Sequence, residues 1–274
     1  MPQFSRNVDK WLTDNPDGTV TFRRETRTMV LWWQAKPESE LKFGPNIAEW
    51  PKIPALADNL LMQVASVLRD PVTTTDELIP SGETSSYRSN PLRLAEFTLS
   101  RRVPDYVPRA KKIAALEAER RADSSPEALR AVLAHFGDAD ALMKTTQFGS
   151  CVFANKPGDG SAREQAASCQ KVLGGFANIC YEFATKRYRS NCINWGMLPF
   201  TLDADTPFDH QPGDCVFVPD VRRTLEQGSE DFPAMVLRAD GSKTPLVLHV
   251  RGLTDDEREI LLDGCLMNYY AKRG

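Results

Sequence analysis

The stretch Gly158–Glu164, which reads Gly-Asp-Gly-Ser-Ala-Arg-Glu, constrains the fold of this chain more than any other feature. Its two glycines tolerate positive φ and come directly before the expected start of a helix. The first amides of a helix are unpaired donors at the positive end of the peptide dipole, so they attract an anion. Arg163 adds a planar guanidinium that matches a carboxylate, and Ser161 places a hydroxyl beside it. The stretch predicts a carboxylate-binding site, although a glycine turn with a serine N-cap explains the same residues.

The size and charge of the chain exclude several classes of protein. With 274 residues it holds one large domain or two small ones, each with a hydrophobic core. Because the net charge is −3, no overall basic field attracts nucleic acid, and an anionic substrate has to be held by local arginines. No stretch reaches the ~18 apolar residues of a membrane span, and no signal peptide opens the sequence. We therefore predict a cytoplasmic protein with neither membrane nor nucleic acid as its partner.

The cysteines and histidines do not predict a metal site in this chain. None of the six cysteines belongs to a Cys-x-x-Cys pair, and the three histidines lack metal-ligand spacing. In a domain of this size, free thiols in a reducing compartment are expected rather than a disulfide framework. Cys151 and Cys169, which lie near the glycine turn in sequence, are expected to be buried and unreactive.

Local patterns divide the chain into two parts. Residues 1–40 are predicted to be a leader or a linker from a preceding domain, with a dense turn signal at Asp14–Gly18 followed by short β-rich runs at Thr19–Phe22 and Met29–Trp33. Residues 41–274 alternate strands with helices, which indicates a mixed α/β domain. Strands are expected at Phe148–Ala154, Phe176–Cys180, Cys215–Val218, Ala234–Arg238 and Pro245–Val250. Helices are expected at about 107–136, with a restart at Ser124–Glu127, at Arg163–Leu173, at Phe183–Trp195 and after a capping box at Thr254–Glu257. The apolar run Leu60–Leu68 fits a helix or a strand.

Five blocks of the sequence resemble motifs of the aconitase superfamily and occur in that family's order. They are Gly44–Ile47, Thr74–Gly82, Gly160–Ala167 (in the family Gly-Ser-Ser-Arg-Glu-His-Ala-Ala), Arg189–Asn191 and Asn194–Phe200. The resemblance covers roughly residues 41–274 and corresponds to the C-terminal swivelling domain, which closes over the iron–sulfur domains of the enzyme. It implies an α/β swivelling domain of the β/β/α type, with a strand at Leu60–Leu68.

The resemblance also implies roles for individual residues. Ser161 matches the serine base, which removes a proton from the carbon next to a substrate carboxylate. Arg88 and Arg163 match arginines that hold substrate carboxylates, and the backbone amide of Ala162 is available to bind one as well. Asp76 matches a buried acidic residue of the active site and is expected to take part in catalysis.

Two positions depart from the family pattern. Ala162 stands where the family has a second serine, and Glu77 stands where it has a histidine after the aspartate. Both departures bear on which hydroxy acid is bound, and less on the type of reaction.

The chemistry of such a site agrees with the residues. Ionising a carbon next to a carboxylate places new charge on a group that is already negative, and arginines and helix-end amides offset it. A serine becomes a base only where donors stabilise its alkoxide. In the family, one iron of a 4Fe–4S cluster acts as the Lewis acid. Because clusters take thiolate ligands and this chain has no cysteine pair, the cluster is expected outside it, in a missing N-terminal portion or a separate large subunit.

We therefore expect the swivelling domain of an aconitase-like hydro-lyase, inactive without its iron–sulfur domains, that dehydrates and rehydrates a di- or tricarboxylic hydroxy acid. A small subunit of the isopropylmalate isomerase type is an alternative, and the length and leader of the chain count against it. A non-catalytic binding or regulatory module is another, opposed by the acidic charge balance.

Overall fold

The computed structural model describes residues 42–122 and 124–273 and, before them, Pro16 and the backbone of three strands. These strands are β1 (Leu12–Asp14), β2 (Thr19–Arg24) and β3 (Arg27–Trp32), which form an antiparallel 3-stranded sheet. The β-rich run predicted at residues 19–22 thus lies in β2, and residues 29–32 of the second run lie in β3, while residue 33 is outside the described residues. The chain divides into two compact units, Met1–Gly44 and Pro45–Gly274.

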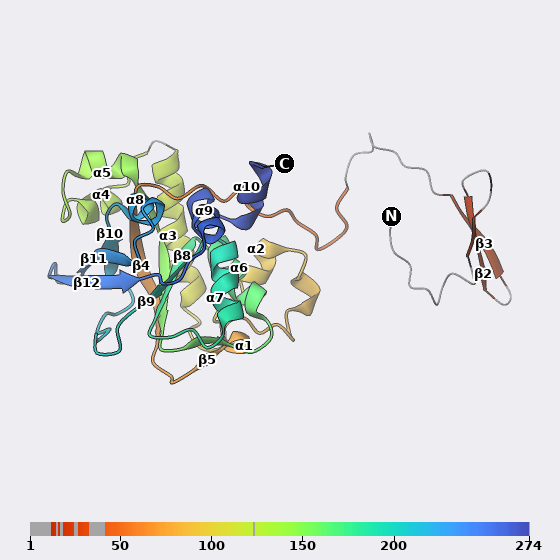
Figure 1. Cartoon of the computed structure of the whole chain (residues 1–274), viewed down its shortest axis with the longest axis horizontal. Helices are drawn as coiled ribbons and strands as arrows, with labels where there is room; N and C mark the ends of the chain where they lie inside the picture. Colours follow the sequence, from red (N-terminus) through yellow and green to blue (C-terminus); the bar gives the residue numbers. More distant parts are fainter. Residues whose placement is uncertain are drawn as a thin grey trace. The chain divides into compact units, whose positions relative to one another are not determined.

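The second unit is built on a closed barrel (Figure 1). Its strand order is β10-β11-β12-β9-β8-β6-β4. The strands are β4 (Asn59–Leu68), β6 (Thr146–Ala154), β8 (Gly175–Cys180), β9 (Leu198–Thr201), β10 (Cys215–Val218), β11 (Asp231–Leu237) and β12 (Lys243–His249). Strands β4, β6, β8 and β9 are parallel, whereas β10, β11 and β12 form an antiparallel meander that closes the barrel onto β4. The ambiguous run Leu60–Leu68 is therefore a strand.

The apolar residues of β4 contribute to two hydrophobic cores, because side chains alternate along a strand. Leu60, Met62 and Val64 belong to the core inside the barrel. Leu61 and Ala65 belong to a second core, which lies between the barrel and the helices that cover it. All residues of β6 and β8 are buried, as expected for parallel strands covered on both faces.

The parallel strands are joined by crossover helices. Helix α6 (Arg163–Val172) joins β6 to β8, and α7 (Lys186–Asn194) joins β8 to β9. In Figure 1 these two helices lie next to α2 (Pro91–Ala95), on the side of the unit away from β11 and β12. The 16-residue helix α3 (Tyr106–Arg121) packs on β6. The remaining elements are α1 (Thr75–Leu78), the 3-10 helix η2 (Ser85–Tyr87), α4 (Glu127–Leu133), α5 (Ala139–Thr145), α8 (Val221–Glu226), α9 (Asp255–Asp263), α10 (Leu266–Ala271) and the short strands β5 (Thr73–Thr74) and β7 (Pro157–Asp159).

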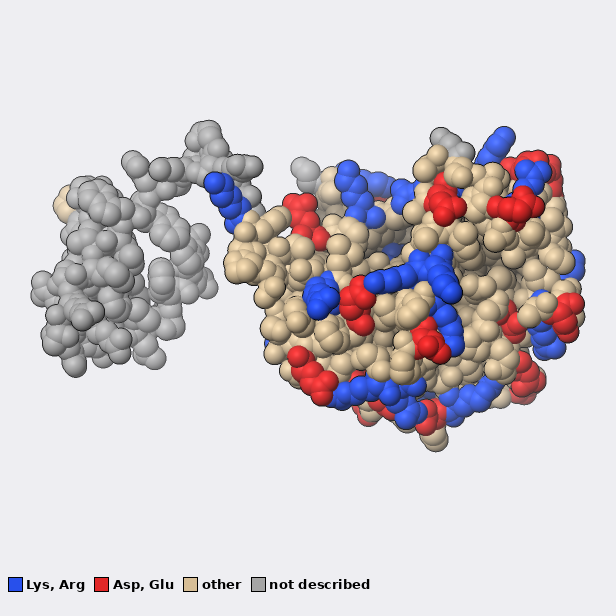
Figure 2. Space-filling view, turned by 180° about the vertical axis from the view of Figure 1, so that it is seen from behind, with Lys and Arg blue, Asp and Glu red and all other residues tan. Residues whose placement is uncertain are grey.

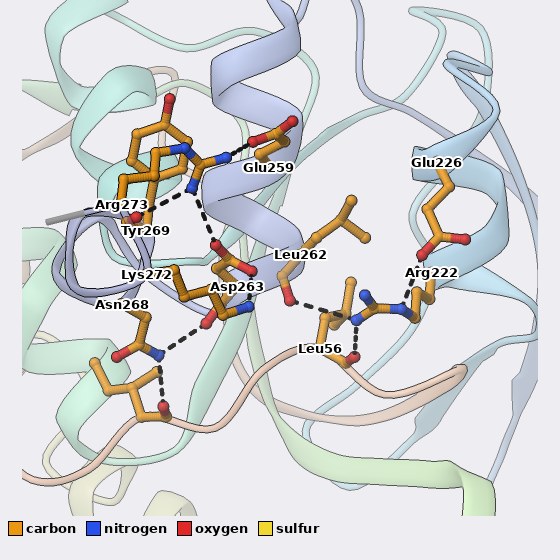
Figure 3. A network of polar contacts seen from close by, with 11 residues as sticks. Leu56, Arg222, Glu226, Glu259, Leu262, Asp263, Asn268, Tyr269, Lys272 and Arg273 are labelled. Carbon is orange, nitrogen blue, oxygen red and sulfur yellow. Dashed lines mark hydrogen bonds and ion pairs between the residues drawn. The ribbon is translucent and has the colours of Figure 1, made fainter.

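Residues 45–58, called the strap below, run into the barrel without forming a helix or strand. Polar contacts from distant parts of the chain hold the backbone of the strap in place (Figure 3). Asn268 Nδ2 donates to Ile53 O at 2.8 Å, and Arg222 Nη1 donates to Leu56 O at 2.8 Å. The amide of Ala57 donates to the Gln147 side chain at 3.0 Å. The C-terminal helices, α8 and β6 thereby fix the end of the strap.

Candidate functional site

A two-stranded pairing brings two distant motifs together. Thr73 pairs with Pro157 and Thr74 with Asp159, so β5 runs parallel to β7. Helix α1 begins directly after β5, and the glycine turn that leads to α6 begins in β7. The Thr-Thr-Asp block and the Gly-Ser-Ala-Arg block, which are far apart in sequence, therefore share one edge of the second unit.

The glycine turn has the backbone geometry that the sequence predicts. Gly158 has φ +98° and Gly160 has φ +128°, a region that disfavours other residues. A Cβ at Gly158 would overlap the ring of Tyr188, and a Cβ at Gly160 would overlap the hydroxyl of Thr75. Thr185 Oγ1 also donates to the carbonyl of Gly158 at 3.1 Å. The turn is therefore held from α1 on one side and from α7 on the other.

Ser161 and Arg163 are open to a ligand. The N-cap of α6 is Ala162, which makes no side-chain cap hydrogen bond, so the interpretation of Ser161 as an N-cap is wrong. Ser161 is exposed, and its hydroxyl makes no hydrogen bond within residues 42–122 and 124–273. Arg163 is half-buried, and its Nε is fully buried without a partner among the same residues. A buried donor without an acceptor costs about 1–3 kcal/mol, which an incoming carboxylate would remove.

Helix α7 fixes the first turn of α6. The Asn191 amide is oriented with its oxygen toward α6, where it accepts from Glu164 N at 2.9 Å, while its nitrogen donates to Arg187 O at 2.9 Å. Trp195 Nε1 donates to Glu164 Oε1 at 3.0 Å. The Arg-Ser-Asn and Asn-Trp-Gly blocks therefore position the helix that carries Arg163.

Asp76 is not buried, which corrects the prediction. Its carboxylate is 58% exposed and forms an ion pair with Arg101 Nη1 at 2.7 Å, while Arg101 Nη2 binds Glu83 at 2.6 Å. The physical reason is that α1 is a short surface helix that buries only Thr75 and Leu78.

Glu77, the second departure from the family pattern, has a local explanation. Its carboxylate accepts from Thr74 N at 2.7 Å, and its own amide donates to Thr74 Oγ1 at 3.2 Å. This is a capping box, which pairs two otherwise free donors at the start of a helix. The glutamate therefore stabilises α1 itself.

Arg88 lies on a neighbouring loop. It follows η2, is exposed, and its guanidinium has no hydrogen bond or ion pair with any residue of 42–122 or 124–273. Helix α2, which begins three residues later, packs on α6. The structure thus brings Asp76, Ser161, Ala162 and Arg163 to one edge, and no contact joins the Arg88 side chain to them.

Lys171 is a feature that the sequence analysis missed. It lies in the last turn of α6 and is only 7% exposed. Its Nζ donates to Gly196 O at 3.0 Å and lies 4.2 Å from the centre of the Phe176 ring. Burial lowers the pKa of Lys171 to about 7. The only signal in the sequence was its place on a helix whose neighbouring residues are buried.

The cysteines do not fit the 4Fe–4S cluster that the resemblance implies. All six are buried, as expected for Cys151 and Cys169, and burial raises the pKa of Cys169 to about 12, so it stays a thiol. Within the described part of the chain, no group of three or more histidine, cysteine or acidic residues could hold a metal ion. This chain's own side chains therefore offer no ligand set for the cluster.

The surface shows no field of one sign on the face drawn in Figure 2, where basic and acidic side chains are interspersed. Arg222 and Glu226, for example, pair at 2.9 Å on α8. Among the helices that the structure describes, none combines the length and the apolar character needed to cross a bilayer.

Comparison with known proteins shows a family resemblance over part of the chain. Residues 114–205, which include β6, the glycine turn, α6, β8, α7 and β9, match the model of the aconitase C-terminal domain. Among solved structures, 3-isopropylmalate dehydratase from Methanocaldococcus jannaschii is similar, with 23% identity and a TM-score of 0.44 over 78% of this chain and 95% of that chain. No curated protein gives a significant match. The predicted resemblance is confirmed: residues 114–205 of this mixed α/β chain carry an aconitase C-terminal domain.

Proposed function

We propose that this chain is the swivelling domain of an aconitase-like hydro-lyase, which isomerises a di- or tricarboxylic hydroxy acid by dehydration and rehydration. The observation that supports this most is the start of α6. There an exposed Ser161 hydroxyl stands beside Arg163, whose buried Nε lacks an acceptor among the described residues.

In this proposal the start of α6 binds one carboxylate of the substrate. Arg163 donates to the carboxylate oxygens, and the Ala162 amide adds a donor at the positive end of the helix. Each charge-assisted hydrogen bond contributes about 1.5–3 kcal/mol. Arg88, which has no partner of its own within the described residues, takes a second carboxylate of the same acid.

Ser161 acts as the base in the proposed reaction. Its Oγ takes the proton from the carbon next to the bound carboxylate, and the charge left on that carbon spreads onto the carboxylate that Arg163 holds. The same cationic surroundings favour the alkoxide form of the serine. A base placed in this way contributes roughly 10²–10⁴ to the rate. Asp76 is proposed to assist the reaction at the same edge with its own exposed carboxylate.

A partner has to complete the site. Ser161 and Arg88 are exposed, and the thiols of this chain do not fit a cluster. We therefore place the 4Fe–4S cluster in the iron–sulfur domains, either in an N-terminal portion of the same enzyme or in a separate large subunit, where it supplies the Lewis acid. The proposed enzyme works in the cytoplasm, where free thiols stay reduced.

An isopropylmalate isomerase-type small subunit remains the second candidate, because the matched aconitase C-terminal domain would serve it equally. It differs in the acid that is bound. A comparison of turnover with citrate and with 2-isopropylmalate separates the two candidates.

Replacement of Ser161 by alanine in the enzyme assembled with its iron–sulfur partner tests the proposal. We expect turnover to fall by ~10²–10⁴ while substrate binding is retained. Ser124→Ala, at an exposed serine away from the glycine turn, is the control and leaves turnover unchanged. Unchanged turnover in Ser161→Ala would contradict the base role and favour a binding module. Turnover by the purified chain alone would contradict the need for a partner.

A further inference from the structure

The strap reaches the first turn of α6 through an aromatic contact. The rings of Trp50 and Trp195 lie 4.3 Å apart between centroids, with an interplanar angle of 39°. Trp195 in turn donates its indole N–H to Glu164 at 3.0 Å. Glu164 follows Arg163 directly in the sequence. The strap is therefore linked to the residue next to Arg163 through two contacts, Trp50 with Trp195 and Trp195 with Glu164.

Two residues earlier, the strap binds the loop that carries the other arginine. The amide of Ala48 donates to the carbonyl of Ser89 at 3.0 Å, and Ser89 follows Arg88 directly. The three residues from Ala48 to Trp50 therefore connect the two places where the proposed site presents a guanidinium.

Trp50 has the character of a contact residue rather than of a core residue. It is 37% exposed and belongs to neither hydrophobic core, unlike most large side chains of this unit. Because Trp50 is this exposed, burial of its side chain contributes little free energy. The specific interaction that Trp50 makes is the packing of its ring against Trp195.

We infer that Trp50 is a positioning residue for carboxylate binding, which holds Arg163 through Trp195 and Glu164 while its neighbour Ala48 holds the Arg88 loop. The inference rests on the proposed function, since it assumes that both arginines bind one acid. In physical terms, the strap fixes the spacing between the Arg88 loop and the start of α6, since among the described residues no contact of the Arg88 side chain links them. The strap therefore sets the length of acid that both arginines reach together.

Binding of tricarballylate, a tricarboxylate without a hydroxyl group, to the full chain tests this inference by calorimetry. Aromatic pairs contribute enough free energy that Trp50→Ala should weaken binding about three- to tenfold. Trp50→Phe keeps a stacked ring and should stay within about twofold of the unmodified chain. Ile47→Ala, at a strap residue that is 45% exposed, is the matched control and should leave the affinity unchanged.

Two further measurements separate positioning from a general loss of structure. The ¹H–¹⁵N resonance of the Trp195 indole, assigned with Trp195→Phe, should shift in Trp50→Ala and remain in place in Ile47→Ala. Glu164→Leu removes the acceptor of the Trp195 indole and should weaken binding as Trp50→Ala does, and the double variant should be no weaker than either single variant.

The outcomes decide the inference in either direction. An unchanged affinity together with an unchanged indole resonance in Trp50→Ala would overturn it, as would additive losses in the double variant. If the unmodified chain does not bind tricarballylate, the proposed function loses its support, and the indole resonance alone still shows whether Trp50 positions Trp195. If Trp50→Ala does not fold, Glu164→Leu, which breaks the next contact of the same chain of contacts, carries the test.

Discussion

Thr185 donates a hydrogen bond from its hydroxyl to the carbonyl oxygen of Gly158 at 3.1 Å, and the same hydroxyl accepts from Tyr188 N at 3.2 Å. One side chain thus caps α7 and holds the glycine turn.

Thr185→Val keeps the shape and loses both hydrogen bonds, so we expect the free energy of unfolding to fall by about 1–2 kcal/mol in urea titrations. Thr185→Ser keeps the hydroxyl and should lose less than half of that. A larger loss in Thr185→Ser than in Thr185→Val would show that the methyl group, not the hydroxyl, matters.

Gly160 should tolerate substitution far less than another glycine of similar backbone geometry. Gly160→Ala forces a strained φ and a clash with Thr75, so a loss of about 2–5 kcal/mol in unfolding free energy is expected. Gly241, with φ +82° and no atom within 4 Å of an added Cβ, is the control, and Gly241→Ala should cost only about 1 kcal/mol. Similar losses at both positions would mean that the contact with Thr75 contributes nothing.

Asp76→Asn should separate a catalytic role from a structural one. The ion pair with Arg101 is exposed, so its loss should change the unfolding free energy by less than ~1 kcal/mol. Turnover of the assembled enzyme should nevertheless fall at least ~10-fold, if the carboxylate assists the reaction. Glu83→Gln removes the other partner of the same arginine and serves as the control. A matching loss of turnover in the control would show that Asp76 acts only through Arg101.

Lys171 should make the stability depend on pH. Its pKa is lowered from 10.5 to about 7 by burial, so between these values the unfolded chain holds the additional proton. The unfolding free energy therefore rises with pH across this window, by up to ~1.4 kcal/mol per pH unit, and the contribution is fully lost below pH 7. We expect Lys171→Met to remove this slope, as measured by urea titrations from pH 7 to pH 8.5.

The pH titration of Lys171→Met needs a control variant, because the buried thiols change the unfolding free energy with pH in the opposite direction. The pKa of Cys169 is raised from 9.0 to about 12, so its contribution to stability is present below pH 9 and is lost above it. Lys52→Met, at an exposed lysine, retains the slope of the unmodified chain. Parallel curves for Lys171→Met and Lys52→Met would contradict a neutral buried amine.

The cysteines should be unreactive in the folded protein. All six are buried, and burial raises the pKa of Cys192 and of Cys215 to about 12. Titration with Ellman's reagent should therefore detect no thiol in buffer and all six after denaturation. A thiol that reacts rapidly in buffer would identify a segment that opens more easily than the barrel.

Several features of the helices and strands were predicted correctly from local signals in the sequence. The strand at Cys215–Val218 has the predicted bounds, and the capping box at Thr254 is formed as expected. Both depend on residues close together in the chain, as does the positive φ of Gly158. The single helix predicted after the capping box is wrong, because Gly264 takes φ +92° and separates α9 from α10. In the helical stretch near residues 107–136, the restart predicted at Ser124–Glu127 is confirmed, because α3 ends at Arg121 and α4 begins at Glu127.

Properties that depend on distant residues could not be predicted. Closure of the barrel pairs Cys215 with Gln63, and no local pattern reports a pairing across so many residues. Asp76 is exposed because α1 buries only Thr75 and Leu78. The pKa of Lys171 is lowered because its amine is buried next to Gly196, which is distant in sequence. The family resemblance supplied the candidate residues of the site, and the pairing of β5 with β7 showed which of them meet.

The parallel order of β6, β8 and β9 has a consequence for the electric field at this edge. Both crossover helices start at the carboxyl ends of their strands, so the positive ends of two peptide dipoles, each worth roughly half an elementary charge, emerge on the same side. The backbone itself thus draws anions toward the glycine turn. Even a chain stripped of both guanidinium groups should keep a weak, salt-sensitive preference for negatively charged molecules.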